Sequence, residues 1–147
     1  MPALEHNIIS KAKSSQYLLA FCGLWLIGLG LYFIFIRAAL LPEDARFLGT
    51  TTAQIQTAVP GIENWLNKVF TVMGGFMTGT GVITVFLAFM VMPLRLKGTT
   101  FSIALTGLFT VILMSGTNFA INSDFKILLV LPPIIWIVSL FLHLKAR

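Results

Sequence analysis

The stretch 69-VFTVMGGFMTGTGVITVFLAFMVMPL-94 contains no Asp, Glu, Lys or Arg over 26 consecutive residues. At about 1.5 Å of rise per residue, a helix of this length measures roughly 39 Å, more than the hydrocarbon thickness of a bilayer, which is about 30 Å. Three other stretches share this lack of acidic and basic side chains: residues 14–36, 98–123 and 127–144. Because lipid offers no hydrogen bonds to the backbone, we expect each stretch to cross the membrane as a helix.

The composition of the whole chain favours the same class of protein. Charged residues make up 10% of the chain, against about 25% in a soluble domain, and the mean hydropathy is +0.93. The net charge of +5 does not indicate a nucleic-acid partner, because the basic residues are scattered between apolar stretches and form no cluster. The expected fold class is an all-α, polytopic membrane protein whose immediate partners are membrane lipids.

Basic residues without acidic neighbours flank the apolar stretches in three segments, and such segments usually stay in the cytoplasm. They are Lys11 and Lys13, Arg95 and Lys97, and Lys145 and Arg147. The short connections after the second and third spans place consecutive helices antiparallel to each other. We therefore expect an antiparallel four-helix bundle in a bacterial inner membrane, with both termini cytoplasmic. The single transmembrane domain, 1–147, has expected helices at about 15–36, 62–92, 99–121 and 127–144.

The connection 37–61 has the pattern of a short helical cap on the outer side of the membrane. Pro42, followed by Glu43 and Asp44, is typical of a first helical turn, where carboxylates favour the positive end of the helix dipole. Glu43, Asp44 and Arg46 are candidates for contact with a partner protein or a cation. Dipole matching and a local surface ion pair explain the same three residues.

Small residues in the first two spans predict close helix packing inside the bundle. Gly75 and Gly79 form a G-x-x-x-G pair, a pattern that lets two helix backbones approach each other in lipid. The complete set of expected packing residues is Gly23, Gly30, Gly74, Gly75, Thr78 and Gly79.

Pro132 and Pro133 remove two amide donors from the fourth span and predict a kink in its outer half. The carbonyls of residues 128 and 129 then need other donors, and the outer end of the third span offers Ser115, Thr117 and Asn118. With Trp136 one turn further along, this junction is also a candidate pocket for a lipid, a quinone or another apolar molecule.

The chain shows no pattern of catalytic, metal-binding or cofactor-binding residues. The expected membrane core contains no Asp, Glu, Lys or Arg, which argues against an ion-coupled transporter. The only histidines, His6 and His143, flank the cytoplasmic surface, and Cys22 is the only cysteine. We therefore expect no enzymatic activity, no cofactor and no metal.

The chain has LWLIGLG at residues 24–30, a proline-containing outer loop, glycines at 74, 75, 79 and 81, and two tightly joined final helices. In this order of elements it resembles the small bacterial DoxX-like four-helix membrane proteins. The resemblance implies a four-helix membrane architecture. It implies no activity and identifies no site residue.

Two functions fit these observations. The first is an accessory or assembly subunit of a larger membrane complex, partnered by other subunits or by copies of itself as a homo-oligomer. The alternative is a binding or transport protein for a lipid, a quinone or another apolar small molecule, which uses the junction of the third and fourth spans.

Overall fold

The computed structural model describes residues 2–146, with side chains from residue 10 onward, and contains only helices and connections in that part of the chain. Four helices are long and apolar enough to cross a membrane: Ser10–Phe35, Ile62–Leu94, Thr99–Ala120 and Leu128–Lys145. The chain is therefore a multi-pass integral membrane protein by length and composition.

The four spans are built from helices of more than one type. The elements in chain order are α1 (Pro2–Phe35), α2 (Pro42–Phe47), α3 (Thr52–Ala58), α4 (Ile62–Phe86), η1 (Leu87–Val91), η2 (Met92–Leu94), α5 (Thr99–Gly107), η3 (Leu108–Ile112), α6 (Leu113–Ala120), η4 (Leu128–Val130) and α7 (Leu131–Lys145). η1 and η3 are π-helical turns, whereas η2 and η4 are 3₁₀ turns.

Local sequence explains one of the two π-helical turns. Pro93 has no amide to donate to the preceding turn, and η1 ends just before it. In the third span, η3 separates α5 from α6, and the hydroxyl of Thr110 donates to the carbonyl oxygen of Thr106 at 2.6 Å there.

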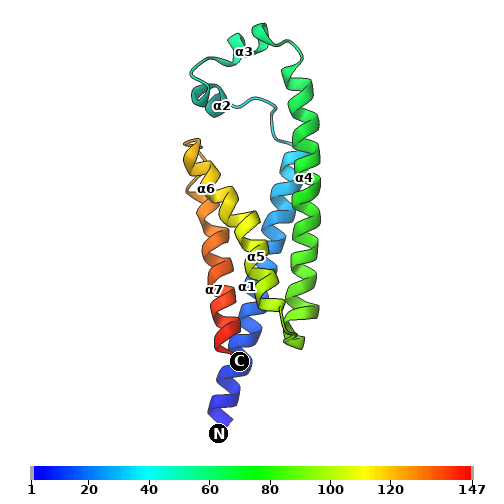
Figure 1. Cartoon of the computed structure of the whole chain (residues 1–147), viewed down its shortest axis with the longest axis vertical. Coiled ribbons are helices and arrows are strands. Elements are labelled where there is room, and N and C mark those ends of the chain that lie inside the picture. Colours follow the sequence, from blue (N-terminus) through cyan, green and yellow to red (C-terminus); the bar gives the residue numbers. More distant parts are fainter. Residues whose placement is uncertain (1, 147) are drawn as a thin grey trace.

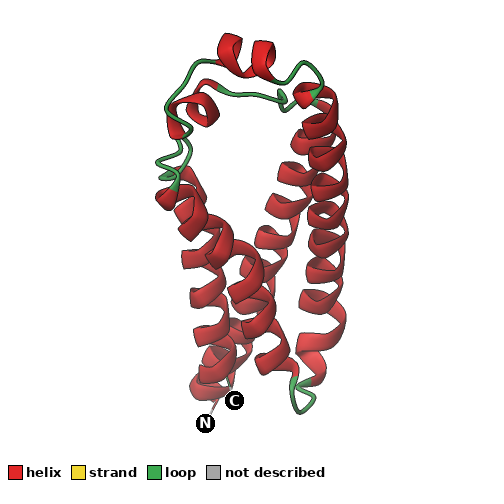
Figure 2. Ribbon diagram, turned by 45° about the horizontal axis from the view of Figure 1, so that its top comes forward, coloured by secondary structure: helices red, strands yellow, loops and turns green. Residues whose placement is uncertain are grey.

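α1 is the central helix of the molecule, because it packs along both α4 and α7. Figure 1 shows the N- and C-terminal ends together at the lower end of the molecule, with the α4–α5 turn beside them. From that end α6 and α7 diverge from α1 and α4, and the connection that carries α2 and α3 bridges the two pairs at the top (Figures 1 and 2).

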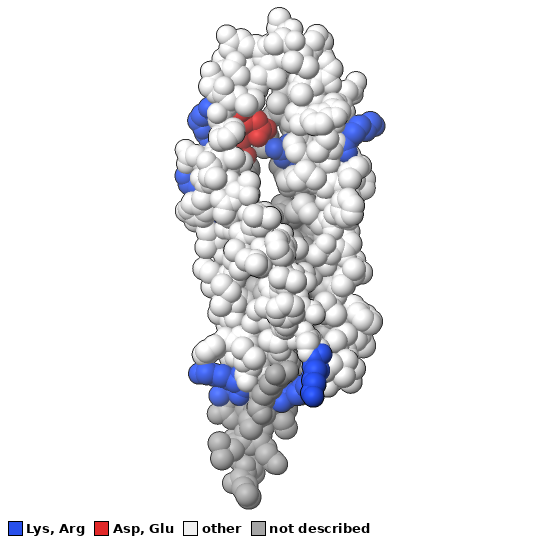
Figure 3. Space-filling view, viewed as in Figure 1, with Lys and Arg blue, Asp and Glu red and all other residues white. Residues whose placement is uncertain are grey.

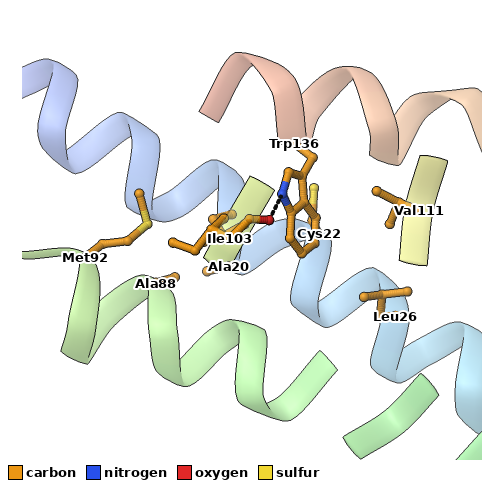
Figure 4. Close-up of a cluster of buried hydrophobic side chains, with 9 residues drawn as sticks. Ala20, Cys22, Leu26, Ala88, Met92, Ile103, Val111 and Trp136 are labelled. Carbon is orange, nitrogen blue, oxygen red and sulfur yellow. Dashed lines mark hydrogen bonds between the residues drawn. The ribbon is translucent and has the colours of Figure 1, made fainter. Parts of the chain in front are cut away.

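The buried core lies where the spans converge (Figure 4). Trp136 of α7 is 1% exposed, and its indole Nε1 donates to the carbonyl oxygen of Ile103 of α5 at 3.0 Å. The ring covers Gly107, where an added Cβ would lie 2.7 Å from Trp136 Cδ1. About one turn further along α7, Ser139 Oγ donates to the carbonyl oxygen of Ser15 at 2.7 Å. These contacts join α7 to both α5 and α1.

α1 and α4 meet along a seam of small residues. A Cβ added to Gly30 would lie 2.6 Å from the carbonyl oxygen of Gly74, and one added to Gly81 would lie 2.5 Å from that of Gly23. Thr78 lies in the same seam and keeps its hydroxyl on the carbonyl of its own helix. We call this contact the glycine seam; its members are Gly23, Gly30, Gly74, Thr78 and Gly81.

The placement predicted for the G-x-x-x-G pair is wrong. A Cβ added to Gly75 or Gly79 would meet no atom within 4 Å, so neither residue takes part in the glycine seam. Both lie on the opposite, outward face of α4 and line a shallow groove there. Residues 74 and 75 are separated by about 100° around the helix, which is enough to turn one of them inward and the other outward.

The kink predicted at Pro132 and Pro133 falls where the helix changes type, because both residues lie in the first turn of α7, directly after the 3₁₀ turn η4. Amides of a first turn have no partner within the helix in any case, so two prolines cost little there. The carbonyl of Leu128 accepts from the amide of Leu131, and the Asn118 side chain donates to Met114 of its own helix at 2.9 Å. The donor for the Leu128 carbonyl is therefore local and does not come from Asn118.

Charged side chains gather at two levels of the molecule, with a broad uncharged belt between them (Figure 3). The lower level includes the α4–α5 turn, which carries Arg95 and Lys97, and the end of α7. The upper level includes Glu43 and Asp44 of α2, in the connection that bridges the two helix pairs. This distribution is what a protein needs when lipid surrounds its middle.

Candidate functional site

A cleft runs between the α1–α4 pair and the third span. It consists of two adjoining cavities of about 380 and 420 Å³, a size range common for small-molecule sites. The two cavities have four lining residues in common: Phe33, Met73, Met114 and Asn118. Because they share these walls, we treat them as one site and call it the cleft.

The cleft exists because large side chains project from the helices on its two sides, and because these helices are held in place by contacts outside the cleft. The glycine seam fixes α1 against α4, and Phe33 and Met73 project from this pair into the gap. Across the gap, α6 diverges from α1 and α4 toward the top of the molecule (Figure 1), and its residues Met114 and Asn118 line the cleft. Methionine adapts to irregular apolar shapes, which suits a wall that contacts a flexible ligand.

The inner part of the cleft reaches the surface that faces lipid. Phe76 of α4 and Phe109 of η3 line this part, and they are 76% and 65% exposed. Figure 3 shows the surface hollowed between the two columns of the molecule, just below the acidic residues. A molecule can therefore enter sideways from the bilayer without passing through the aqueous phase.

The outer end of the cleft is polar and centres on Arg37, which follows α1. Its guanidinium carbon lies 3.7 Å from the centroid of the Phe70 ring, and Nη2 lies 3.4 Å from Asp44 Oδ2. Nη1 donates to the carbonyl of Ala38 at 2.9 Å. The side chain is only 10% exposed, so aromatic stacking and one long ion pair hold a cation that is almost out of contact with water.

The cap helix α2 is fastened to the segment that follows α6. Glu43 is buried, and its Oε2 accepts from Ser123 Oγ at 3.0 Å and from the amide of Asp124 at 2.8 Å. Arg46 Nη2 forms an ion pair with Asp124 Oδ1 at 2.8 Å. Glu43 and Arg46 thus bridge the two helix pairs over the cleft and make no ion pair with each other.

Asp44, the third residue of the predicted cap contact, lines the cleft together with Glu43. Its Oδ2 accepts from the amide of Leu41 at 2.8 Å and faces Arg37, so the carboxylate also begins α2. All three predicted cap residues therefore have partners within the chain. Contact with a separate protein or a cation stays a prediction for each of them.

The residues predicted to form one junction lie in two places. Thr117 and Asn118 line the cleft, whereas Trp136 belongs to the buried core and Pro132 accepts from Cys22 Sγ at 3.5 Å. Pro133 and Ser115 are buried and line neither cavity. The cleft therefore keeps part of the predicted pocket, because Leu128 and Leu129 of η4 line it together with Asn118, but its other walls come from α1 and α4 and not from Trp136.

Sequence reasoning missed the residues that give the cleft its polar groups and its walls. Arg37 is not among the predicted site residues, although it follows Phe33 by about one turn and so lies on the same face. Trp25 also lines the cleft, and its indole nitrogen is buried without a hydrogen-bond partner in the described structure. A buried donor of this kind favours a ligand or a movement that supplies an acceptor.

No group of three or more His, Cys, Asp or Glu side chains in residues 10–146 is arranged to hold a metal ion. No family model, curated protein or solved structure matches the chain. Inferences about function therefore depend on the geometry of the cleft and on the surfaces of the helices.

Proposed function

We propose that the chain is an antiparallel four-helix protein of a bacterial inner membrane, with both termini in the cytoplasm and the α2–α3 cap on the outer side. Support comes from the uncharged belt and from the excess of basic residues at the end that carries the termini. Protease or cysteine-labelling maps of each connection in intact cells test this topology. An odd number of crossings would overturn it.

We propose further that the protein binds a lipid, a quinone or another apolar small molecule in the cleft. The observation that carries this proposal is the cleft itself, which has apolar walls, a lateral opening between α4 and η3, and polar groups at its outer end. An empty apolar gap of this size forfeits van der Waals contacts, and a lipid-like ligand restores them. No catalytic step is part of this function.

A blocking variant tests the binding function. Met114→Trp places an indole in the wall shared by both cavities, and Val82→Trp is the matched control, because Val82 is 54% exposed on α4 and lines neither cavity. Native mass spectrometry of the protein extracted in mild detergent then measures bound lipid and quinone. We expect Met114→Trp to remove most of the bound mass and Val82→Trp to keep it. Equal retention by both variants would overturn the proposal.

A second candidate function, an accessory or assembly subunit of a larger membrane complex, is favoured by the outward face of α4. Gly75 and Gly79 line a groove there with no helix of this chain against it. Such a groove admits the helix of another subunit or of a second copy. The test is native gel electrophoresis after mild extraction, comparing wild type with Gly75→Leu. Migration of wild type as a monomer without a companion protein would argue against this function.

A further inference from the structure

We propose that the ligand of the cleft is a zwitterionic phospholipid with a primary amine in its headgroup, with its phosphate on Arg37 and its ammonium on Asp44. This inference rests on the proposed binding function and adds the chemical class of the ligand. It is drawn from the charges at the outer end, from their unused hydrogen-bonding groups and from the depth of the cleft.

The charges at the outer end match a zwitterion better than an anion or a neutral molecule. Arg37 supplies one positive charge, whereas Glu43 and Asp44 supply two negative charges to the same cavity lining. An anionic headgroup would meet an excess of carboxylate, and a neutral quinone would bring no charge of either sign to this end. A headgroup with a phosphate and an ammonium complements both signs.

The charged residues retain hydrogen-bonding capacity for such a headgroup. A guanidinium has five N–H groups, and Arg37 uses two of them, toward Ala38 and toward Asp44 at the long distance of 3.4 Å. Asp44 Oδ1 has no hydrogen-bond partner in the part of the chain that the structure describes, whereas Oδ2 is taken by Leu41 and Arg37. A phosphate therefore finds donors on Arg37, and an ammonium finds an acceptor on Asp44.

The preference for a primary amine follows from the same geometry. Carboxylate oxygens only accept hydrogen bonds, so they favour an ammonium that carries N–H groups over a quaternary amine that carries none. Each methyl group added to the headgroup nitrogen removes one donor. Phosphatidylethanolamine is the simplest lipid of this class.

The depth of the cleft matches the acyl chains of one leaflet. Along α1, its lining extends from Arg37 at the outer end to Trp25, a distance of about 18 Å at 1.5 Å per residue. This is slightly more than half of the hydrocarbon thickness of about 30 Å. A lipid of the outer leaflet, with its headgroup under the cap, thus places its chains along Phe33, Met73 and Met114.

The experiment measures occupancy by native mass spectrometry while dioleoyl lipids are added to delipidated protein at equal concentrations. The lipid series is phosphatidylethanolamine, its N-methyl and N,N-dimethyl forms, phosphatidylcholine and phosphatidylglycerol. We expect at least about fivefold higher occupancy by phosphatidylethanolamine than by phosphatidylcholine or phosphatidylglycerol, with a stepwise fall as methyl groups are added. This series uses the wild-type chain and needs no variant to fold. Equal occupancy across the series would overturn the inference.

Variants then test which residue is responsible for the preference for a primary amine. Asp44→Asn keeps an oxygen for the amide of Leu41 and removes the charge, so we expect the preference for the primary amine to disappear while phosphatidylcholine binding persists. Asp124→Asn is the matched control, because it makes the same change outside the cleft lining and should keep the preference. A preference that survives Asp44→Asn would overturn the assignment.

The two proposals fail in different ways. If Met114→Trp lowers the occupancy of every lipid while wild type shows no headgroup preference, the cleft binds lipid and only the zwitterion inference fails. If Met114→Trp leaves occupancy unchanged, the lipid lies elsewhere on the protein and the binding function itself fails.

Discussion

The same two helices, α1 and α4, pack closely against each other along one face and border the open cleft with another. Along the glycine seam, the backbones of Gly30 and Gly74 approach so closely that even a methyl group would overlap. On the neighbouring faces, Phe33 and Met73 border a cleft of several hundred Å³. The difference shows that side-chain volume decides which helix faces meet in this protein, since the more hydrophobic face is the one that stays open.

The physical reason lies in the solvent. Lipid tails are as apolar as leucine, so two helices gain nothing by hiding apolar side chains from them, and close van der Waals contact is what stabilises a helix pair. Small residues allow such contact along the seam. Large residues facing the cleft prevent it, and a lipid chain there replaces the missing helix contacts.

The largest loss of stability is expected from a substitution in the glycine seam. Gly74→Leu forces a side chain against the carbonyl of Gly30 and against Ile34, so we expect a loss of about 3 kcal/mol or more in the free energy of unfolding. Gly75→Leu is the matched control on the adjacent residue, where nothing lies within 4 Å. Unfolding by SDS in mixed micelles measures both, and a similar loss for the two variants would contradict the packing described.

A smaller effect compares the packed and open faces of the third span. Val111 is fully buried, so Val111→Phe should overpack the core and cost about 2 kcal/mol. Met114 faces the cleft, where Met114→Phe finds room and should change stability by less than about 1 kcal/mol. The same unfolding assay ranks the pair, and the reverse order would show that the cleft is closed in the membrane.

A third comparison concerns the hydrogen bond that joins α5 to α7. Trp136→Phe removes the donor to the carbonyl of Ile103 and should cost about 1 kcal/mol, the usual worth of a buried bond between membrane helices. Trp65→Phe changes an exposed indole that has no hydrogen bond in the described structure, and its effect should be close to zero. Thermal unfolding in detergent checks the difference, and equal stability of the two variants would show that the bond contributes nothing.

The smallest effect concerns the ion pair that holds the cap above the cleft. Arg46 and Asp124 are half-exposed or more, so Asp124→Asn should cost no more than about 0.5 kcal/mol. The loss should shrink at high salt, because screening weakens exposed charges first. Unfolding curves at low and high ionic strength measure it, and a loss of several kcal/mol would mean that the cap is a major source of stability.

Parts of the site followed from sequence and parts did not. The small residues Gly23, Gly30, Gly74 and Thr78 were identified by their spacing, and the structure places them together. Their neighbours Gly75 and Gly79 have the same composition and spacing but turn outward. The sequence pattern identifies small residues that allow two helices to approach closely. The rotation of the helix about its axis decides which of these residues face the neighbouring helix.

The polar junction was located only in part, for a related reason. Pro132 and Pro133 look like helix breakers in a continuous apolar run, but the chain begins α7 at that point and satisfies the preceding carbonyl locally. Asn118 was correctly singled out as an unusual polar group in a span. The cleft that it lines is bordered by α1 and α4 as well as by Leu128 and Leu129 of η4.

The sequence alone determined the number of spans and their approximate ends, because a lipid environment penalises every charge and every unpaired backbone group regardless of what lies next to it. Only the tertiary structure decided which face of α4 packs, where the cleft opens and that Arg37 and Asp44 meet at its end. Those outcomes depend on helix rotation and on contacts between segments far apart in the chain, where one residue of rotation, about 100°, exchanges an inner face for an outer one.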